Sequence, residues 1–249
     1  MQKKPQTIYS NADGTGSHAV AGIARHMAIS EALERWAYYA TVRSSRAGEF
    51  GFEVDPSSNG MSAFPGMFRR DARRKAVLEA VERYCLLSWW EGLAEGHEVA
   101  TDWPGVSAVA IDGPFGGVSV VAYARAQWGG YVYGYGAEES VGAACERAVV
   151  ELARHDMVLR AWWLGFVAGD KTLPTGLFER RCLFFASEEG YQLFRERLAR
   201  PAGRALVRPE VVCDCEIPGP WSEYATVWRF ALQPPSREFL EPDERYFFW

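Results

Sequence analysis

The sequence predicts an α/β protein of the α+β kind, in which long helices pack on a mainly antiparallel or mixed sheet. Two long segments with apolar residues at helical spacing are followed by a block of alternating β-branched and aromatic residues, and then by a third long helical segment. Hydrophobic residues make up 48% of the 249, enough for a sizeable core. We expect one domain over residues 1–249, with an irregular C-terminal tail at 236–249.

The first two helices are expected on either side of a loop. Residues 18–42 hold apolar residues at helical spacing without proline, and the turn NADGTGSH leads into them. Residues 44–66 are rich in Gly, Ser and Pro, which is typical of a loop with room for one short strand. Residues 67–94 return to helical spacing and predict the second long helix.

The middle of the chain changes from the helical period to alternation. The stretches VSAVAI, GVSVVAYARAQ and GYVYGYG are separated by DGPFGG and WGG, which predicts a strand followed by a hairpin. A third helix is expected at 138–166, opening with two acidic residues that suit a helix N-terminus. In the last third, RCLFFA resembles a strand, a short helix is expected to begin at Ser187, and ALVRPEVVCDC and EYATVWRFAL resemble strands.

Charge and composition exclude several classes of function. A net charge of −5 leaves no basic face for nucleic acid. The sequence lacks an apolar run of 18 residues and a secretory signal, so we expect neither a membrane span nor export. The five cysteines are odd in number and scattered among apolar residues, which fits reduced thiols in the cytoplasm.

Acidic residues and arginines recur on all three expected helices, among bulky apolar neighbours. Residues three or four apart share one face of a helix, so the charges on each helix point the same way. If the helices pack together, their charged groups converge. The carboxylates are Glu31, Glu34, Asp71, Glu79, Glu82 and Glu151, and the arginines are Arg83 and Arg147.

So many carboxylates cannot stay ionised side by side without a counter-ion, because like charges raise each other's pKa. A magnesium ion is a suitable counter-ion, since it prefers oxygen ligands and is commonly held by carboxylates together with substrate phosphates. The two arginines could then bind those phosphates in a bidentate manner. The three helices together favour a magnesium–nucleotide site, although each helix taken alone is more typical of a solvated face with local ion pairs.

Several motifs together resemble the YcaO family. SNGMSA at 58–63, followed by RDARRKAVLEAVERY, is similar to the family's glycine- and serine-rich turn and acidic helix. EALERW resembles its first acidic helix, and DGPFGG with GYGAEESVGAACERAVVELA resembles its third block. The matches run in family order from about residue 14 to 155, over more than half of the chain.

The resemblance implies a chemistry. YcaO proteins use ATP and magnesium to phosphorylate a peptide backbone amide, which gives an azoline when a Cys, Ser or Thr side chain of the peptide adds, or a thioamide when sulfide adds. Matched by motif, the six carboxylates would hold magnesium, and Arg83 and Arg147 would hold phosphates and act in catalysis. Ser58 and Asn59 would lie near the nucleotide.

The sequence also departs from the family. Thr15 stands where the first turn usually has Lys, Asp71 replaces Glu, and the segment between Arg35 and Ser58 is short. The resemblance therefore implies a pared-down member that works on a precursor peptide with a partner protein, as a homodimer or hetero-oligomer. The alternative from another class is a non-catalytic scaffold or peptide-binding subunit. A third reading is a structural domain with surface ion pairs.

Other signals are weaker. GTGSHA fits a dinucleotide fingerprint, but it follows a polar segment where a buried strand is needed. Cys213 and Cys215 lie on one face of an expected strand, where buried structural thiols explain them better than zinc does. The tryptophan pairs at 89–90 and 162–163 are typical of helix packing, and could also bury a dimer interface.

Overall fold

The computed structural model describes residues 14–65, 68–169, 176–200 and 206–247. It confirms the predicted class, because long helices accompany two antiparallel sheets. The described chain divides into two compact units. Unit 2 draws on Asn11–Tyr84 and Arg208–Pro235, and unit 1 on Cys85–Val207 and Ser236–Trp249. The single domain over the whole chain stays a prediction. Within the described residues, none of the helices has the length and apolar character needed to cross a membrane.

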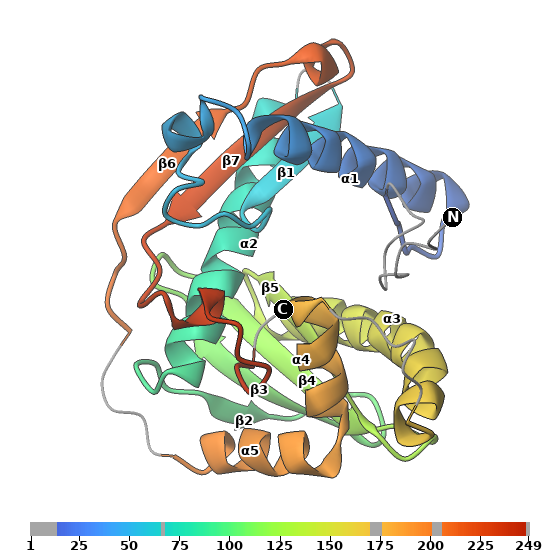
Figure 1. Cartoon of the computed structure of the whole chain (residues 1–249). Helices are drawn as coiled ribbons and strands as arrows, with labels where there is room; N and C mark the ends of the chain where they lie inside the picture. Colours follow the sequence, from blue (N-terminus) through green and yellow to red (C-terminus); the bar gives the residue numbers. More distant parts are fainter. Residues whose placement is uncertain (1–13, 66–67, 170–175, 201–205, 248–249) are drawn as a thin grey trace. The chain divides into compact units, whose positions relative to one another are not determined.

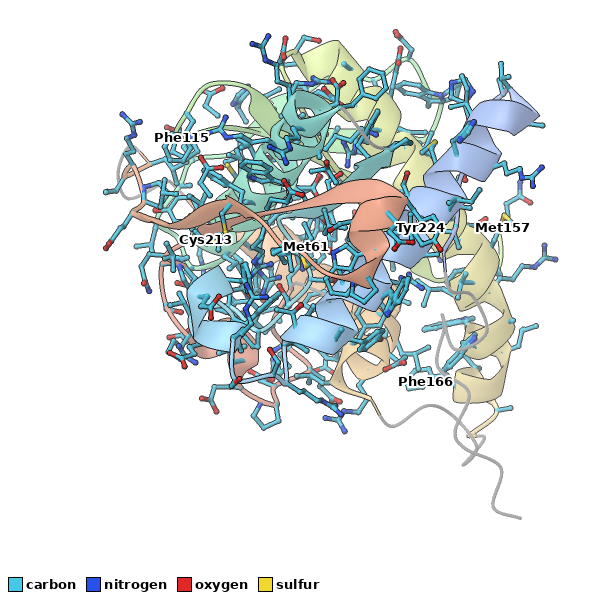
Figure 2. All side chains as sticks on the ribbon, turned by 90° about the horizontal axis from the view of Figure 1, so that it is seen from above. Met61, Phe115, Met157, Phe166, Cys213 and Tyr224 are labelled. Atoms are coloured by element: carbon cyan, nitrogen blue, oxygen red, sulfur yellow. The ribbon has the colours of Figure 1, made fainter. Side chains whose placement is uncertain are left out.

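Unit 2 is built on a three-stranded antiparallel sheet in the order β1–β7–β6. The strands are Met61–Pro65, Ala225–Leu232 and Val211–Glu216, so the last strand in sequence is central (Figure 1). Helix α1, Ala21–Thr41, packs against β1 and β7. The core between them includes Ala37, Phe50, Phe52, Met61, Ala63, Ile217, Trp221, Ala225, Val227 and Ala231 (Figure 2 labels Met61).

The first part of α2, Arg69–Trp90, covers the other face of this sheet. The ammonium of Lys75 lies 5.1 Å from the ring centre of Phe64, and the guanidinium of Arg73 lies 6.0 Å from that of Phe230. Two short 3-10 helices complete unit 2, at Ala47–Phe50 and Pro220–Glu223. The loop from 51 to 60 connects the first of these to β1 and passes close to β7.

Unit 1 contains a four-stranded antiparallel sheet in the order β2–β3–β4–β5 (Figure 1). Its strands are His97–Val99, Val106–Asp112, Val118–Arg125 and Tyr131–Glu138. Helix α3, Val141–Val167, lies along β5 and β4. Small and branched side chains fill this interface, among them Ala108, Ala110, Val120, Ala122, Val132, Ala144, Ala148 and Leu152.

The Tyr-Gly alternation of β5 explains how closely α3 approaches. The tyrosines point to one face and the glycines to the other, since side chains alternate along a strand. A Cβ on Gly136 would stand 2.5 Å from the carbonyl oxygen of Ala144, and one on Gly134 would overlap the α3 backbone at Ala148. Glycine is therefore required on the helix-facing side.

Aromatic residues build the core on the opposite side of this sheet. Helices α4, Leu177–Ala186, and α5, Glu188–Leu198, cover it together with the end of α2 and the C-terminal segment. That segment is irregular, as predicted, apart from a 3-10 turn at Glu238–Leu240. Phe247 in this segment is fully buried, and its ring contacts Trp89, Trp90, Tyr133, Tyr135, Phe185 and Phe194.

Most predicted elements are present, and one was wrong in type. RCLFFA forms the second half of α4 and is not a strand. An apolar run of this length is ambiguous by itself, whereas the longer window LFERRCLFFA buries Cys182, Phe185 and Ala186 at helical spacing. The third helix also starts later than predicted, because Glu138 ends β5 and Ser140 caps α3 by accepting from the Ala143 N–H.

Candidate functional site

Helices α1 and α2 bring three of the predicted carboxylates close together in unit 2. Glu34 lies between Glu31, one turn earlier on α1, and Glu79 on α2. Burial raises the pKa of Glu34 well above its usual value, and the charges of Glu79 and Glu31 raise it further, whereas Arg35 and Lys75 act in the opposite direction. The convergence predicted for these two helices is therefore present for three of their carboxylates.

The turn Gly14-Thr15-Gly16 positions Glu31. The backbone N–H and the hydroxyl of Thr15 both donate to Oε2 of Glu31, at 2.7 and 2.8 Å. Arg35 donates to Oε1 of the same carboxylate at 2.6 Å. A Cβ on either glycine of the turn would overlap the backbone carbonyls of α1, so both glycines serve close packing and not a phosphate loop.

Arg83 lies in a buried ion pair instead of on an open surface. Its Nε donates to Oδ2 of Asp55 at 2.5 Å and its second guanidinium nitrogen to Oδ1 at 3.2 Å. Both side chains are 8% exposed. Burial opposes the ionisation of Asp55, but the charges of Arg83 and Arg229 outweigh it and hold the pKa of this carboxyl below its usual value. As it stands, Arg83 holds the loop that carries the predicted nucleotide turn.

Arg229 on β7, which the pattern of charged helices does not predict, completes this anchorage. Its side chain is fully buried, and it donates to four backbone carbonyls of the loop region. The acceptors are the oxygens of Phe50 at 3.4 Å, Asp55 at 2.9 Å, Ser57 at 3.0 Å and Asn59 at 2.6 Å. An arginine inside the apolar strand ATVWRFAL is the signal that could have found it, since a buried arginine requires acceptors.

The predicted nucleotide residues Ser58 and Asn59 lie in this anchored loop. Asp55 accepts from the Ser57 N–H at 3.0 Å, and Ser57 accepts from the Asn59 N–H at 3.3 Å. Gly60 has a φ of +79°, and a Cβ there would overlap the carbonyl oxygen of Phe230, so the sharp turn into β1 depends on glycine. The turn is rigidly held before any ligand arrives.

The charges that chiefly shift the pKa of Glu34 do not include Asp71 or Glu82 of the same unit. Asp71 lies in the first turn of α2, where a carboxylate offsets the helix dipole, and Glu82 is partly buried one turn beyond Glu79. Arg147 and Glu151 belong to unit 1. Arg147 approaches Glu138 at 3.5 Å and is 43% exposed.

Glu151 has partners other than Arg147. Arg154 donates to Glu151 at 3.0 Å, and the buried ring of His155 lies 3.8 Å from the same carboxylate. Burial lowers the pKa of His155, and its Nδ1 lies 2.7 Å from the carbonyl oxygen of Tyr133. Arg147 is therefore paired with Glu138, and Glu151 with Arg154. Both are local ion pairs of the kind typical of a solvated helix face.

The fit of the cluster to magnesium is good in charge but incomplete in geometry. A raised pKa at Glu34 means that a cation placed nearby would restore its negative charge, which is the behaviour expected of a carboxylate cation site. Within the residues that the structure describes, however, no three His, Cys, Asp or Glu side chains are gathered closely enough to hold a metal ion. The carboxylates have to rotate before they can bind one together.

Comparisons with protein-family models, with curated proteins and with solved structures returned no match.

Proposed function

We propose that the protein activates backbone amides of a ribosomally synthesised precursor peptide by ATP-dependent phosphorylation, with Mg²⁺ as the essential ion. The amide oxygen takes the γ-phosphoryl group of ATP and ADP leaves. A nucleophile then adds to the amide carbon and phosphate departs, giving an azoline or a thioamide. The proposal includes a cytoplasmic location, a partner protein that assists with the peptide, and a homodimer or hetero-oligomer as the working form.

The observation that carries the proposal is the charge imbalance around Glu34. The charges of Glu79 and Glu31 raise the pKa of Glu34 beyond the effect of burial, and Arg35 and Lys75 do not offset them. The ionisation of Glu34 opposes folding, because its pKa is higher in the folded protein than in the unfolded chain. The arrangement is consistent with a site that a divalent cation completes.

Each part of the site has a distinct role in the proposal. Glu31, Glu34 and Glu79 would hold the ion, which when bound neutralises the phosphate charge. The loop with Ser58 and Asn59, fixed by Arg83 and Arg229, would lie near the nucleotide. Arg147, which is 43% exposed, would bind phosphate through its guanidinium group.

Titration calorimetry of ATP with and without Mg²⁺ tests this function. ATP should bind in the presence of the metal and not with EDTA, and Glu79→Gln should weaken the metal-dependent heat. Glu223→Gln is the matched control, because Glu223 is an exposed glutamate of the same unit. Equal heats with Mg²⁺ and with EDTA would contradict the proposal.

A second candidate is a non-catalytic scaffold or peptide-binding subunit, and one observation favours it. Both arginines expected at the phosphates already have carboxylate partners, Asp55 for Arg83 and Glu138 for Arg147. In a scaffold these pairs are the final state of the side chains. In the enzyme, Arg147 exchanges an exposed partner for phosphate, which costs little because exposed pairs contribute about 0–1 kcal/mol.

Arg147→Lys separates the two candidates. If Arg147 stabilises the phosphoryl group, the variant loses the planar fork and on the order of 2–4 kcal/mol of transition-state stabilisation. In a scaffold, lysine replaces it without effect. The measurement is conversion of the precursor peptide in the reconstituted complex, followed by mass spectrometry as loss of water or exchange of oxygen for sulfur. Unchanged conversion would contradict a catalytic role for Arg147 and favour the scaffold.

A further inference from the structure

Two thiols lie side by side on the edge strand of unit 2. Cys213 and Cys215 are two residues apart on β6, so they share a face, and their sulfur atoms are 3.4 Å apart (Figure 2 labels Cys213). Cys213 is buried and Cys215 is partly exposed. The other three cysteines of the chain, at 85, 145 and 182, are all buried.

The backbone spacing allows these two thiols to be joined. Two residues of a strand span about 6.6 Å, from a rise of about 3.3 Å each. Disulfides accept Cα separations of about 4.4–6.8 Å, so the strand lies at the upper end of this range. The pairing of β6 with β7 shifts register between Val211 and Cys213, so the ladder is already irregular next to the two thiols.

The chemical environment assigns a different part to each thiol. The pKa of Cys215 is lowered to about 7, chiefly by its hydrogen bond with the Cys213 thiol. The pKa of Cys213 is raised by the same hydrogen bond and by burial. Thiolate is the nucleophile in disulfide exchange, so the partly exposed Cys215 is suited to attack first and Cys213 to follow.

We propose that Cys213 and Cys215 are a thiol-exchange site that reacts with low-molecular-weight disulfides and closes to a reversible intrastrand disulfide. The Cys215 thiolate attacks one sulfur of the small disulfide and releases the other half as a thiolate. Cys213 then loses its proton to water and attacks the Cys215 sulfur, and the second small thiolate leaves. Overall, two protein thiols are oxidised and one small disulfide is reduced to two thiols.

The site has a direct mechanical connection to the anchored loop. Cys215 is opposite Arg229 in the β6–β7 register, and the Cys213 thiol lies 3.8 Å from the Arg229 carbonyl oxygen. Arg229 in turn holds the loop through its bonds to Asp55, Ser57 and Asn59. Closing the disulfide shortens the path between the two cysteines, so we expect the change to reach residues 55–60 through Arg229.

The first test exposes the folded protein to glutathione disulfide at pH 7.5 and measures its intact mass. The mass should fall by two hydrogen atoms and return after treatment with a dithiol reductant. Tryptic mapping locates the change, because residues 205–229 form one peptide that contains only these two cysteines and Arg208 is followed by Pro209. A wild-type protein left unmodified, or carrying a stable glutathionyl group, would overturn the proposal.

Two serine variants test the order of attack. Cys213→Ser keeps the attacking thiol and removes the one that closes the ring, so it should stop as a mixed disulfide that gains one glutathionyl group. Cys215→Ser should react far more slowly, by at least about tenfold, because the remaining thiol is buried with a raised pKa. Equal reactivity of the two variants would refute the assigned roles.

Hydrogen exchange tests the link to the loop. Amides of residues 55–60 should change their exchange rate when the oxidised and reduced forms are compared, whereas those of β3 and β4 in unit 1 should not. Identical rates in the loop would refute the connection through Arg229. Neither mass nor exchange requires ATP, so a failure here is distinct from a failure of the proposed function.

Discussion

Replacing Glu34 by glutamine should stabilise unit 2 at neutral pH, although it removes a charged residue from a helix. The pKa of Glu34 is raised in the folded protein, mainly by burial and then by Glu79 and Glu31. The unfolded chain has the usual value of about 4.5. Glutamine keeps the shape of the side chain and cannot ionise, so it removes this difference between the two states.

The sign and the size of the effect follow from proton linkage. The folded state binds the proton more tightly, so stability is fully present below about pH 4.5 and falls as the pH rises through the folded pKa of Glu34. Each unit by which the folded pKa exceeds the unfolded one costs about 1.4 kcal/mol. Glu34→Gln should recover this loss at pH 7.5 and change little at pH 4.

Urea unfolding with pulsed hydrogen exchange and mass spectrometry is suitable, because peptides from α1 and from residues 69–84 of α2 report unit 2 separately from unit 1. The exposed Glu223→Gln provides the control for loss of one negative charge. Added Mg²⁺ should stabilise the wild type at pH 7.5 more than it stabilises Glu34→Gln, since the ion replaces the proton in offsetting the charges.

A Glu34→Gln variant that is less stable than the wild type at pH 7.5 would refute this reasoning. Glu34 would then be an ionised member of a stabilising network with Arg35 and Lys75. A stability gain of equal size at pH 4 and at pH 7.5 would also contradict it, because an effect without pH dependence cannot come from ionisation.

Two further predictions concern buried side chains. Arg83→Met leaves Asp55 buried without its main partner, so unit 2 should lose about 3–5 kcal/mol in urea unfolding, and replacing Asp55 by leucine in the same chain should restore a large part of it. Phe247→Ala empties the centre of the aromatic core of unit 1, so the free energy of unfolding of unit 1 should fall by about 3–5 kcal/mol. The measurement is urea unfolding followed on unit 1 peptides. An unchanged urea midpoint would mean that the C-terminal segment does not pack there.

Local sequence patterns predicted most of the secondary structure. The helices at α1, α2 and α3 follow from apolar residues at helical spacing, and β3, β4 and β5 from alternation between glycine-rich turns. The error at α4 has a local cause as well, since six apolar and charged residues satisfy both periods. Phe185 of α4 and Phe194 of α5 are buried against Tyr133 of the same sheet. These contacts favour a helix at α4, and they join residues that are distant in sequence.

The candidate site was harder to predict than the secondary structure, because the residues that hold its loop are distant in sequence. Glu31, Glu34 and Glu79 could be grouped by their helical faces. The pairing of Asp55 with Arg83 and the reach of Arg229 to the loop depend on β7 lying beside β1, which a repeat of charged motifs does not predict. The division of the chain between two units has the same origin, since long-range strand pairing creates it.

The late position of β7 also has a consequence for biosynthesis. β7 lies between β1 and β6, so while the ribosome is still translating residues before 225, β1 has no strand partner in this sheet. Unit 1 waits even longer, because Phe247, which fills its aromatic core, is translated after β7. Neither unit can therefore complete its core until these late residues have been translated. The nascent chain carries an unpaired β1 until β7 emerges, and we expect its yield in cells to depend on chaperones and on translation at low temperature.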